Sequence, residues 1–350
     1  QPSATGGNAV AIGDSAVAGG VDAFSVSAGA SASGAYGIAM GRGTTASGDD
    51  SLALVKFSTA SGTDAMAFGD YAVASGNYSI SFGGDTDATG FASVAIGKDA
   101  QSVGSRSIAI GRAYASGADS FAAAIANNTN SYGAQQTSSI AIGKQAKATS
   151  GQATAIGEAT QATSSNSVCI GYYSQATAQG AVALGYDAQA TAGKAFAFGF
   201  SVRNPIENSF KFAGGKFAAA GDAQGGMYIL RADTTDATAT VLTTNNTTPG
   251  TTDQIVAASD TCIMFSGTLV AMQNGAQDQG GWEIKGLLKN DGGTTTLVSS
   301  NIQTFADGNG WVVALTADNT NNALAITCTG EASHNIRWVA NIHTSEVTYA

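Results

Sequence analysis

The tetrapeptides Val94-Ala95-Ile96-Gly97 and Ile108-Ala109-Ile110-Gly111 are two copies of one motif, in which large apolar residues flank a small residue before a glycine. The motif recurs through residues 10–200. Within each of two blocks, successive glycines of the motif are 14 or 28 positions apart. The glycines are Gly13, Gly41, Gly69, Gly83, Gly97, Gly111, Gly143, Gly157, Gly171, Gly185 and Gly199. A fixed period of this kind predicts stacked repeats, with each glycine at the corner of a coil.

Some repeats are imperfect. The copies Phe24-Ser25-Val26-Ser27 and Leu52-Ala53-Leu54-Val55 lack the final glycine, and Phe121-Ala122-Ala123-Ala124 stands one residue early. A polar insertion then interrupts the rhythm over residues 126–138. Two interpretations stay open, because solenoids tolerate imperfect coils and because insertions in repeat proteins often form loops on a binding face.

Each repeat contains a second short segment after the glycine. Small residues stand three and five positions after it, as Ala72 and Ala74 do on either side of Val73. Fourteen residues at ~3.3 Å each suffice for two short strands and two turns. We predict that the alanine pairs of the second strand face inward and that the variable residue between them faces water. We also predict that the central alanine of the first strand faces outward, on an apolar face where three copies of the chain meet.

The composition excludes several classes of protein. Glycine accounts for 46 of 350 residues but proline for only 3, which excludes collagen. The glycine content disfavours helical bundles, the 43% of hydrophobic residues disfavours disorder, and no apolar run is long enough for a membrane helix. A formal charge of −10 argues against nucleic acid as a partner. We therefore expect an all-β protein that neither binds nucleic acid nor inserts into a membrane.

The periodic pattern ends at Phe200. Residues 201–225, with Pro205 and spaced phenylalanines, are expected to form a neck that closes the edge of the roll. Alternating strands separated by turn signals follow in residues 226–350, so we predict an antiparallel β-sandwich of the jelly-roll type. The predicted strands are 227–232, 237–243, 254–258, 261–272, 282–289, 295–305, 311–317, 323–329 and 335–348. The predicted domains are therefore a roll over 1–200, a neck over 201–225 and a sandwich tip over 226–350.

Two parts of the chain resemble known families. The segments Asn8-Ala9-Val10-Ala11-Ile12-Gly13 and Asn166-Ser167-Val168-Cys169-Ile170-Gly171 resemble the head repeats of YadA-like trimeric adhesins, over about residues 8–200. This resemblance implies a left-handed parallel β-roll that forms a homotrimer and binds host surfaces; bacteriophage fibres carry the same repeats. The pattern from Trp311 onward, through Ile336-Arg337-Trp338-Val339-Ala340, resembles the C-terminal domains of phage tail-fibre proteins.

Motifs for catalysis are absent from the sequence. There is no G-x-S-x-G elbow, no phosphate-binding loop and no H-E-x-x-H, and His334 and His343 are nine positions apart. The stretch Gly83-Gly84-Asp85 matches only part of the G-G-x-G-x-D motif of calcium-binding β-roll repeats. We therefore expect no catalytic residues, no metal and no cofactor. A bridge between Cys262 and Cys328 and two free buried thiols are both compatible with the sequence.

Candidate receptor-binding residues lie in three loops. Trp282 and Trp311 each follow a glycine turn, so they are either exposed at strand ends or cap the core of the sandwich. Asp307 and Asn309 belong to the turn before Trp311. The polar insertion contributes Asn127, Asn128 and Tyr132.

These observations favour a trimeric attachment fibre on a bacteriophage virion, as a tail or capsid fibre. Its expected partners are two further copies of itself, virion proteins at its base, and a glycan or protein receptor on the host. The alternative is a trimeric adhesin on a bacterial surface, but we expect that class to carry a coiled-coil stalk and membrane-anchor strands after the head. A tailspike that cleaves glycans is a third and weaker interpretation, because it needs paired carboxylates in a groove.

Overall fold

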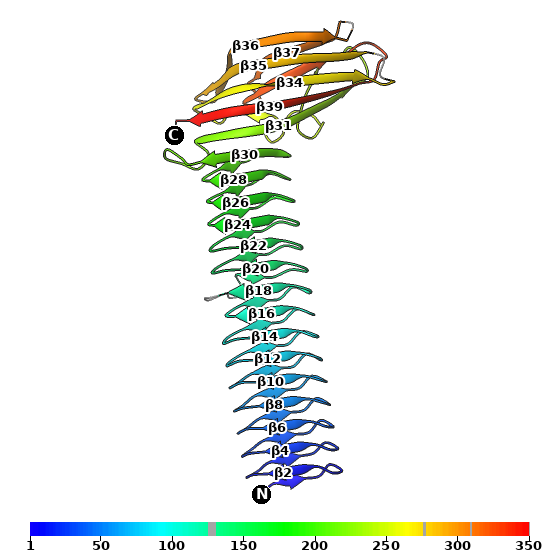
Figure 1. Ribbon diagram of the computed structural model, residues 1–350, viewed down its shortest axis with the longest axis vertical. Helices are drawn as coiled ribbons and strands as arrows, with labels where there is room; N and C mark the ends of the chain where they lie inside the picture. Colours follow the sequence, from blue (N-terminus) through cyan, green and yellow to red (C-terminus); the bar gives the residue numbers. More distant parts are fainter. Residues whose placement is uncertain (125–130, 276–277, 309, 350) are drawn as a thin grey trace. The chain divides into compact units, whose positions relative to one another are not determined.

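The computed structural model describes residues 1–124, 131–275, 278–308 and 310–349 (Figure 1). All regular secondary structure in this part of the chain consists of β-strands. It contains no helix of the length and apolarity that a membrane span requires. Contacts divide the chain into two compact units, Gln1–Asn166 and Ser167–Ala350. The fold is all-β, with a parallel β-solenoid and antiparallel sheets toward the C-terminus, as the sequence predicts.

The first unit is a solenoid in which two strands alternate along the chain. The first strand of each coil pairs in parallel with the equivalent strand of the next coil, as Met66 does with Ile80. These strands are β2 (Val10–Ile12), β4 (Phe24–Val26), β6 (Ile38–Met40), β8 (Leu52–Leu54), β10 (Met66–Phe68), β12 (Ile80–Phe82), β14 (Val94–Ile96), β16 (Ile108–Gly111), β18 (Phe121–Ala124), β20 (Ile140–Ile142) and β22 (Thr154–Ile156). We call the sheet that they form the first-strand sheet.

The second strands form a parallel sheet on the other side of each coil. They are β1 (Ser3–Ala4), β3 (Val17–Ala18), β5 (Ser31–Ala32), β7 (Thr45–Ala46), β9 (Thr59–Ala60), β11 (Val73–Ala74), β13 (Asp87–Ala88), β15 (Gln101–Ser102), β17 (Tyr114–Ala115), β19 (Gly133–Ala134), β21 (Lys147–Ala148) and β23 (Gln161–Ala162). Its register also advances by one full repeat from strand to strand, so that Val73 pairs with Asp87. We call it the second-strand sheet.

The space between the two sheets is filled by small side chains. Ala53, Ala67 and Ala95 of the first strands, and Ala60 and Ala74 of the second strands, are each at most 1% exposed. The prediction that the alanines of the first strand face outward is therefore wrong. So short a coil brings its two sheets so close that methyl groups fill the interior, and the large apolar residues must point outward. The inward direction of the second-strand alanines is confirmed.

In the regular coils, the turns at both ends contain a residue in the left-handed conformation. These residues recur every seven positions, for example Asp50, Phe57, Asp64 and Tyr71 with φ of 55°, 55°, 54° and 57°. Asp and Asn adopt this conformation more readily than other non-glycine residues. Asp and Asn recur at spacings that are multiples of seven, and this recurrence is the sequence signal for the turns. The signal is easily missed because the glycine motif has a period twice as long.

All eleven glycines of the motif have positive φ, between 73° and 152°. At Gly69, with φ of 152°, an added Cβ would also collide with the backbone of Gly83 in the next coil. A second glycine column occupies the opposite turn. At Gly62 a Cβ would collide with the carbonyl group of Gly76, so this column is needed for close stacking. The φ angles of this column are ordinary, so that the approach of the next coil is what requires glycine there.

The irregular coils keep the register of the solenoid. Strand β18 pairs with β16 at a spacing one residue shorter than the repeat, so that Phe121 lies beside Ile108. It pairs with β20 across a longer interval that contains the insertion, with Phe121 beside Ile140. The strands on either side of the insertion are therefore paired in register. Strands β4 and β8, which lack the final glycine, also pair in register, as Phe24 with Ile38 and Leu52 with Met66 show.

The second unit begins with further coils of the same kind. Its first strands are β24 (Val168–Tyr172), β26 (Val182–Tyr186), β28 (Phe196–Phe200) and β30 (Ser209–Gly214), and its second strands are β25 (Gln175–Ala176), β27 (Gln189–Ala190) and β29 (Arg203–Asn204). Phe198 pairs in parallel with Phe212, and Ala190 pairs with Asn204. The predicted neck at 201–225 thus contains one more coil, which the sequence concealed because Lys211 replaces the buried alanine and the corner glycine is missing.

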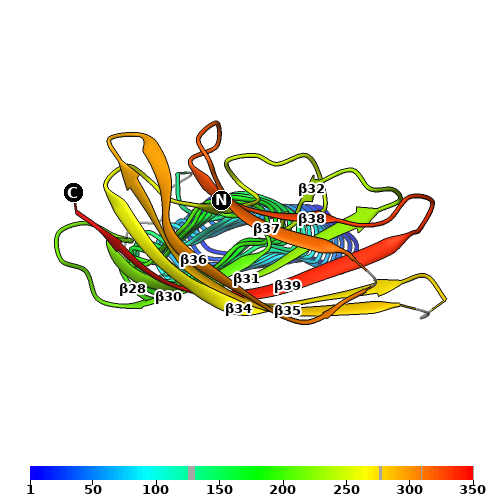
Figure 2. The same cartoon turned by 90° about the horizontal axis from the view of Figure 1, so that it is seen from above.

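An antiparallel sandwich completes the second unit. One sheet contains β31 (Ala223–Thr234), β34 (Thr261–Gln273), β35 (Gln279–Asp291), β36 (Thr294–Asp307) and β39 (Ile336–Thr348), and the other contains β32 (Thr240–Val241), β33 (Ile255–Val256), β37 (Val312–Asp318) and β38 (Ala323–Thr329) (Figure 2). Strand β39 lies between β31 and β34, which gives the Greek-key order β39-β34-β35-β36. A jelly roll contains two such keys, so the expected topology is present only in part.

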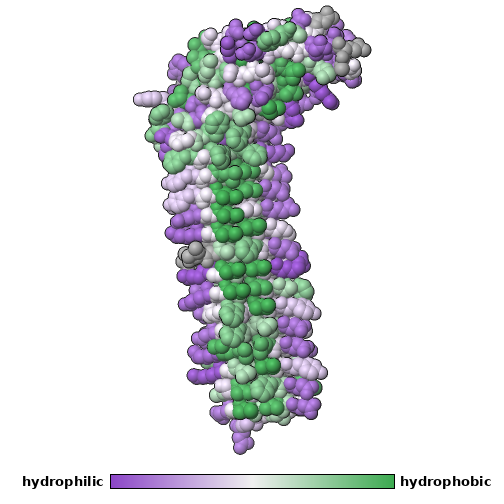
Figure 3. Space-filling view, in the orientation of Figure 1, coloured by the Kyte–Doolittle hydropathy of each residue, from purple (hydrophilic) through white to green (hydrophobic). Residues whose placement is uncertain are grey.

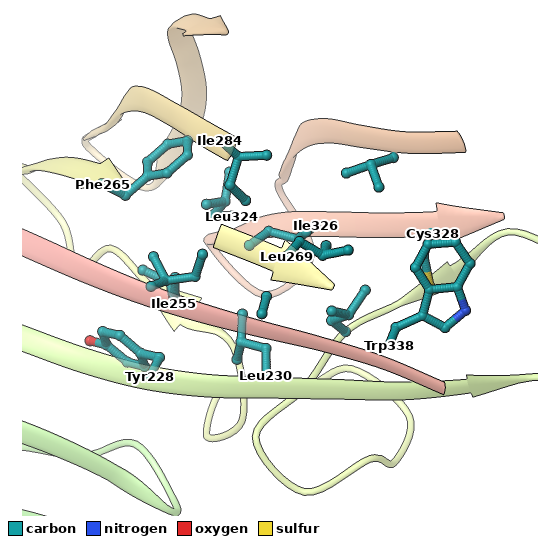
Figure 4. Packing of buried hydrophobic residues seen from close by; sticks show 14 of the residues in the cluster. Tyr228, Leu230, Ile255, Phe265, Leu269, Ile284, Leu324, Ile326, Cys328 and Trp338 are labelled. Carbon is teal, nitrogen blue, oxygen red and sulfur yellow. The ribbon is translucent and has the colours of Figure 1, made fainter. Parts of the chain in front are cut away.

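The core of the sandwich consists of large side chains, in contrast to the solenoid. Tyr228, Phe265, Leu269 and Trp338 are buried between the two sheets (Figure 4). The three cysteines are free thiols, which resolves the open question of a bridge between Cys262 and Cys328. Burial raises the pKa of the Cys328 thiol to about 12.

Candidate binding surfaces

The outward side of the first-strand sheet carries a column of large apolar side chains in the first unit. Ile12 is 55% exposed and Phe82 is 51% exposed, while the central residue of the strand is buried in most coils. We call this surface the apolar stripe; Figure 3 shows it as a green band. In the first unit it consists of Val10, Ile12, Phe24, Val26, Ile38, Met40, Leu52, Leu54, Met66, Phe68, Ile80, Phe82, Val94, Ile96, Ile108, Ile110, Phe121, Ile140, Ile142 and Ile156.

The rings in the stripe stack between neighbouring coils. The Phe68 and Phe82 rings are 4.9 Å apart and nearly parallel. This stacking follows from the register, because equivalent residues of successive coils stand side by side. It leaves the outer faces of the side chains uncovered, and exposed apolar surfaces of such length are characteristic of interaction sites.

The second unit has a stripe of its own. Its members are Val168, Ile170, Tyr172, Val182, Leu184, Tyr186, Phe196, Phe198, Phe200, Phe210 and Phe212. The Tyr186 ring stacks on both Tyr172, at 5.1 Å, and Phe200, at 4.8 Å. Here the stripe is wider than in the first unit because the strands are longer.

Within the second unit the stripe continues onto the antiparallel sheet. Phe196 pairs with Phe210, and Phe210 pairs with Met227 of β31. Exposed apolar residues follow on the same sheet at Ile229, Met264, Val270, Met272 and Val339. Val270 and Val339 stand directly opposite each other on β34 and β39. One sheet face therefore bears apolar side chains from the last coils to the sandwich.

The sequence leaves two positions open for Trp282 and Trp311, and the structure shows the buried one. Trp282 and Trp311 are each 3% exposed. Their rings flank Trp338, at 5.6 and 5.5 Å, in the core of the sandwich. The alternative interpretation, that they cap the core, describes their position. Gly281 lies inside β35, and a glycine before a tryptophan does not indicate which side of the sheet the ring occupies.

The other candidate receptor residues fall in two loops. Asp307 is exposed at the end of β36, and its backbone carbonyl accepts a hydrogen bond from the Trp311 amide. Tyr132 is half-buried, and its carbonyl accepts a hydrogen bond from the Gln135 side chain. Asn127, Asn128 and Asn309 lie outside the described residues. A receptor-binding role for these loops stays a prediction.

A buried ionic cluster joins the last coil to the sandwich. Lys211 Nζ lies 2.8 Å from Glu346 Oε2, and both side chains are at most 5% exposed. The Tyr228 hydroxyl, the Gln224 amide and the Thr344 hydroxyl also donate hydrogen bonds to Glu346. Burial raises the pKa of the Glu346 carboxyl, but Lys211 and these donors outweigh it, so the pKa lies below its usual value. The cluster is fully paired and connects β30, β31 and β39.

The described residues show no arrangement suited to metal binding. Within residues 1–124, 131–275, 278–308 and 310–349, no three His, Cys, Asp or Glu side chains gather as metal ligands would. In the partial calcium motif, burial and the neighbouring Asp85 raise the pKa of the Asp87 carboxyl.

The fold and the stripe define a class of protein, a β-solenoid with an apolar outer face. The YadA head domain repeat family matches residues 4–26, 32–54, 60–86, 88–113, 134–157, 148–174 and 176–201. The coils of this chain are therefore YadA head domain repeats, which are adhesin-like and indicate a surface-exposed fibre.

Comparisons with whole proteins add little to this assignment. No curated protein matches the chain. Among solved structures, the tailspike protein of Acinetobacter baumannii phage AM24 is 8% identical, with 87% of this chain aligned and a TM-score of 0.20. The alignment spans 47% of the tailspike, and a score this low carries no argument about fold or function.

Proposed function

We propose that the chain is a homotrimeric attachment fibre, in which the apolar stripes of three copies face one another. The observation that carries this proposal is the outward direction of the large apolar residues in successive YadA-type coils. An isolated chain leaves this surface in contact with water, at a cost of roughly 25 cal/mol for each Å². Association of three copies through the stripe removes it from water.

Trimer formation gives an attachment fibre its strength of binding. Three identical receptor sites on one fibre convert the second and third contacts into intramolecular events, which raises avidity without any new contact. Weak individual sites then suffice for stable attachment to a surface that carries many receptors.

The particle that carries the fibre is, in our proposal, a bacteriophage virion. The resemblance of the segment from Trp311 onward to phage tail-fibre domains supports this assignment. A trimeric adhesin on a bacterial surface is the second candidate, and the YadA head repeats favour it.

Electron microscopy with a gold-labelled antibody against the chain distinguishes the two candidates. Label on fibres of purified phage particles is the expected result. Label confined to the surface of uninfected bacteria would replace the virion assignment with the adhesin. Label on neither would contradict both.

A further inference from the structure

One turn of the solenoid in the first unit gathers cationic and aromatic side chains from three successive coils. Arg42 and Lys56 occupy equivalent positions in adjacent coils. Phe57 directly follows Lys56, and Tyr71 is the equivalent of Phe57 in the next coil. The Phe57 amide donates to the Arg42 carbonyl at 2.9 Å, and the Tyr71 amide donates to the Lys56 carbonyl at 3.1 Å. The backbone ladder thus holds the four residues side by side; we call them the cationic-aromatic edge.

The side chains of this edge contact one another. The Arg42 guanidinium carbon lies 5.7 Å from the centre of the Phe57 ring. Lys56 Nζ lies 5.0 Å from the Phe57 ring and 5.5 Å from the Tyr71 ring, and the two ring centres are 5.1 Å apart. The Phe57 ring lies over Gly43, where an added Cβ would come within 2.6 Å of it. The result is a pair of adjacent rings bordered by two cations.

The aromatic residues of the edge are unfavourable for the local backbone. Phe57 and Tyr71 have φ of 55° and 57°. Equivalent turn positions in neighbouring coils are Ser15, Gly29, Gly43, Asp85 and Asp99. Bulky residues in the left-handed region are outliers that the fold must hold in place, and such outliers cluster at functional sites. Tyr71 is also half exposed to solvent.

The charge distribution singles out the same turn. Arg42 and Lys56 are the only Lys or Arg residues before Lys98, and eight Asp residues occur in the same part of the sequence. Lys56 lies 3.8 Å from Asp70, and both side chains are about half exposed. The positive charge of this region is therefore concentrated beside two aromatic rings, on a protein with a formal charge of −10.

We propose that the cationic-aromatic edge binds an acidic saccharide, a pyranose ring that carries a carboxylate. The planar guanidinium of Arg42 pairs with the carboxylate through two parallel N–H donors, which is the geometry that arginine favours. Lys56 adds a second charge, and the apolar C–H face of the sugar packs on the exposed aromatic surface of Phe57 and Tyr71. The inference rests on the proposed attachment function and names the receptor chemistry at one site.

The chain offers matched variants for a test. Arg42→Gln removes the guanidinium, and Phe57→Asn removes the ring with a residue that tolerates positive φ. Lys98→Gln is the control, because Lys98 occupies the same coil position four repeats after Arg42 but is followed by Asp99 instead of an aromatic residue. Thermal unfolding followed by circular dichroism establishes that each variant is folded before binding is measured.

Binding is measured by biolayer interferometry on immobilised polygalacturonate at low salt. Two further surfaces carry the fully methyl-esterified polymer, which has the ring without the charge, and polyacrylate, which has the charge without the ring. We expect wild type and Lys98→Gln to bind polygalacturonate alike, and neither to bind the other polymers. Arg42→Gln is expected to weaken binding by about tenfold or more, since one lost charge-assisted contact has that effect. Phe57→Asn is expected to weaken binding because it removes the aromatic surface on which the sugar packs.

Several outcomes would overturn the proposal. These are no binding by the wild type, equal binding to polyacrylate, or equal losses in Lys98→Gln and Arg42→Gln. The mass of the same samples in solution is measured by light scattering. This measurement distinguishes failure of the saccharide site from failure of the proposed trimer. A trimer that does not bind contradicts the saccharide site alone, whereas a monomer that binds contradicts the trimeric fibre alone.

Discussion

Val55 occupies a position at which the repeat normally has its corner glycine. Its φ is 77°, in the region that β-branched residues avoid. Such a residue stores strain of roughly 1–3 kcal/mol, whereas glycine at this position loses somewhat more chain entropy on folding. The solenoid holds this coil in register despite the strain, because β8 pairs with both neighbours.

The variant Val55→Gly is therefore expected to increase the free energy of unfolding by about 1 kcal/mol. The measurement is chemical denaturation followed by circular dichroism. Val103→Gly is the control, since Val103 is exposed but is not among the residues with positive φ. We expect Val103→Gly to lower the free energy of unfolding. An equal decrease in Val55→Gly would contradict the proposed strain at Val55.

At the same scale, the Lys211–Glu346 pair makes the second unit sensitive to acid. The folded protein lowers the pKa of Glu346 below the usual 4.5, so the carboxylate is favoured by folding. Its contribution to stability is complete above that pH and is lost as the pH falls through the lower, folded value. We expect thermal unfolding of the wild type to shift to lower temperature below about pH 4.5, with a smaller pH-dependent shift in Glu346→Gln.

Removal of one partner tests the pair at neutral pH. Lys211→Ala installs the residue found in the preceding coil, Ala197, but leaves a buried carboxylate without its cation. Loss of one partner of a buried pair typically costs about 3–5 kcal/mol. The double variant Lys211→Ala, Glu346→Gln is expected to recover part of this loss. Additive effects of the two substitutions would show that the pair is not coupled.

At the scale of the element, the coil depends on its second glycine column. A Cβ at Gly62 would collide with the next coil, whereas at Gly84, on the opposite turn, the nearest atom is the Asp70 carbonyl oxygen at 3.9 Å. Gly62→Ala is therefore expected to lower the unfolding temperature by several degrees, and Gly84→Ala to change it little. Differential scanning calorimetry measures both, and tolerance of alanine at Gly62 would contradict the close stacking.

The sequence predicts the elements better than the direction of their side chains. The regular spacing of the motif places the strands of the coils correctly, and alternation places the strands of the sandwich within a few residues. The inward face was misassigned because Val10, Ala11 and Ile12 are all apolar, so alternation distinguishes two faces without indicating which is buried. The distance between the two sheets decides it, and that distance is a property of the closed coil.

The candidate binding residues were harder to predict for the same reason. Gly281, before Trp282, lies inside β35 and not in a turn, and only the packing of the sandwich places the Trp282 ring against Trp338. Conversely, Arg42 and Lys56 look unrelated in sequence until the coil brings them to the same turn. Their separation by one repeat, with Phe57 directly after Lys56, is the sequence signal for this edge.

At the scale of the whole molecule, the outward stripe replaces the alanine face as the proposed contact between copies. Substitution of Phe68 and Phe82 by Asp introduces charge into a face that association would bury. Val17→Asp with Val73→Asp is the matched control on the second-strand sheet, where Asp87 occurs naturally beside Val73. We expect trimers of the Phe68→Asp, Phe82→Asp variant to dissociate at a higher protein concentration than wild-type trimers. The control variant is expected to dissociate at the same concentration as the wild type.

The mass of the wild-type protein in solution tests the trimer most directly. The chain has a mass of 34.6 kDa, and sedimentation equilibrium over a wide concentration range measures its assemblies without a tag or a surface. A trimeric fibre predicts a single species of three times this mass that persists on dilution. A species of 34.6 kDa at every concentration would contradict the proposal that the apolar stripe is buried between copies.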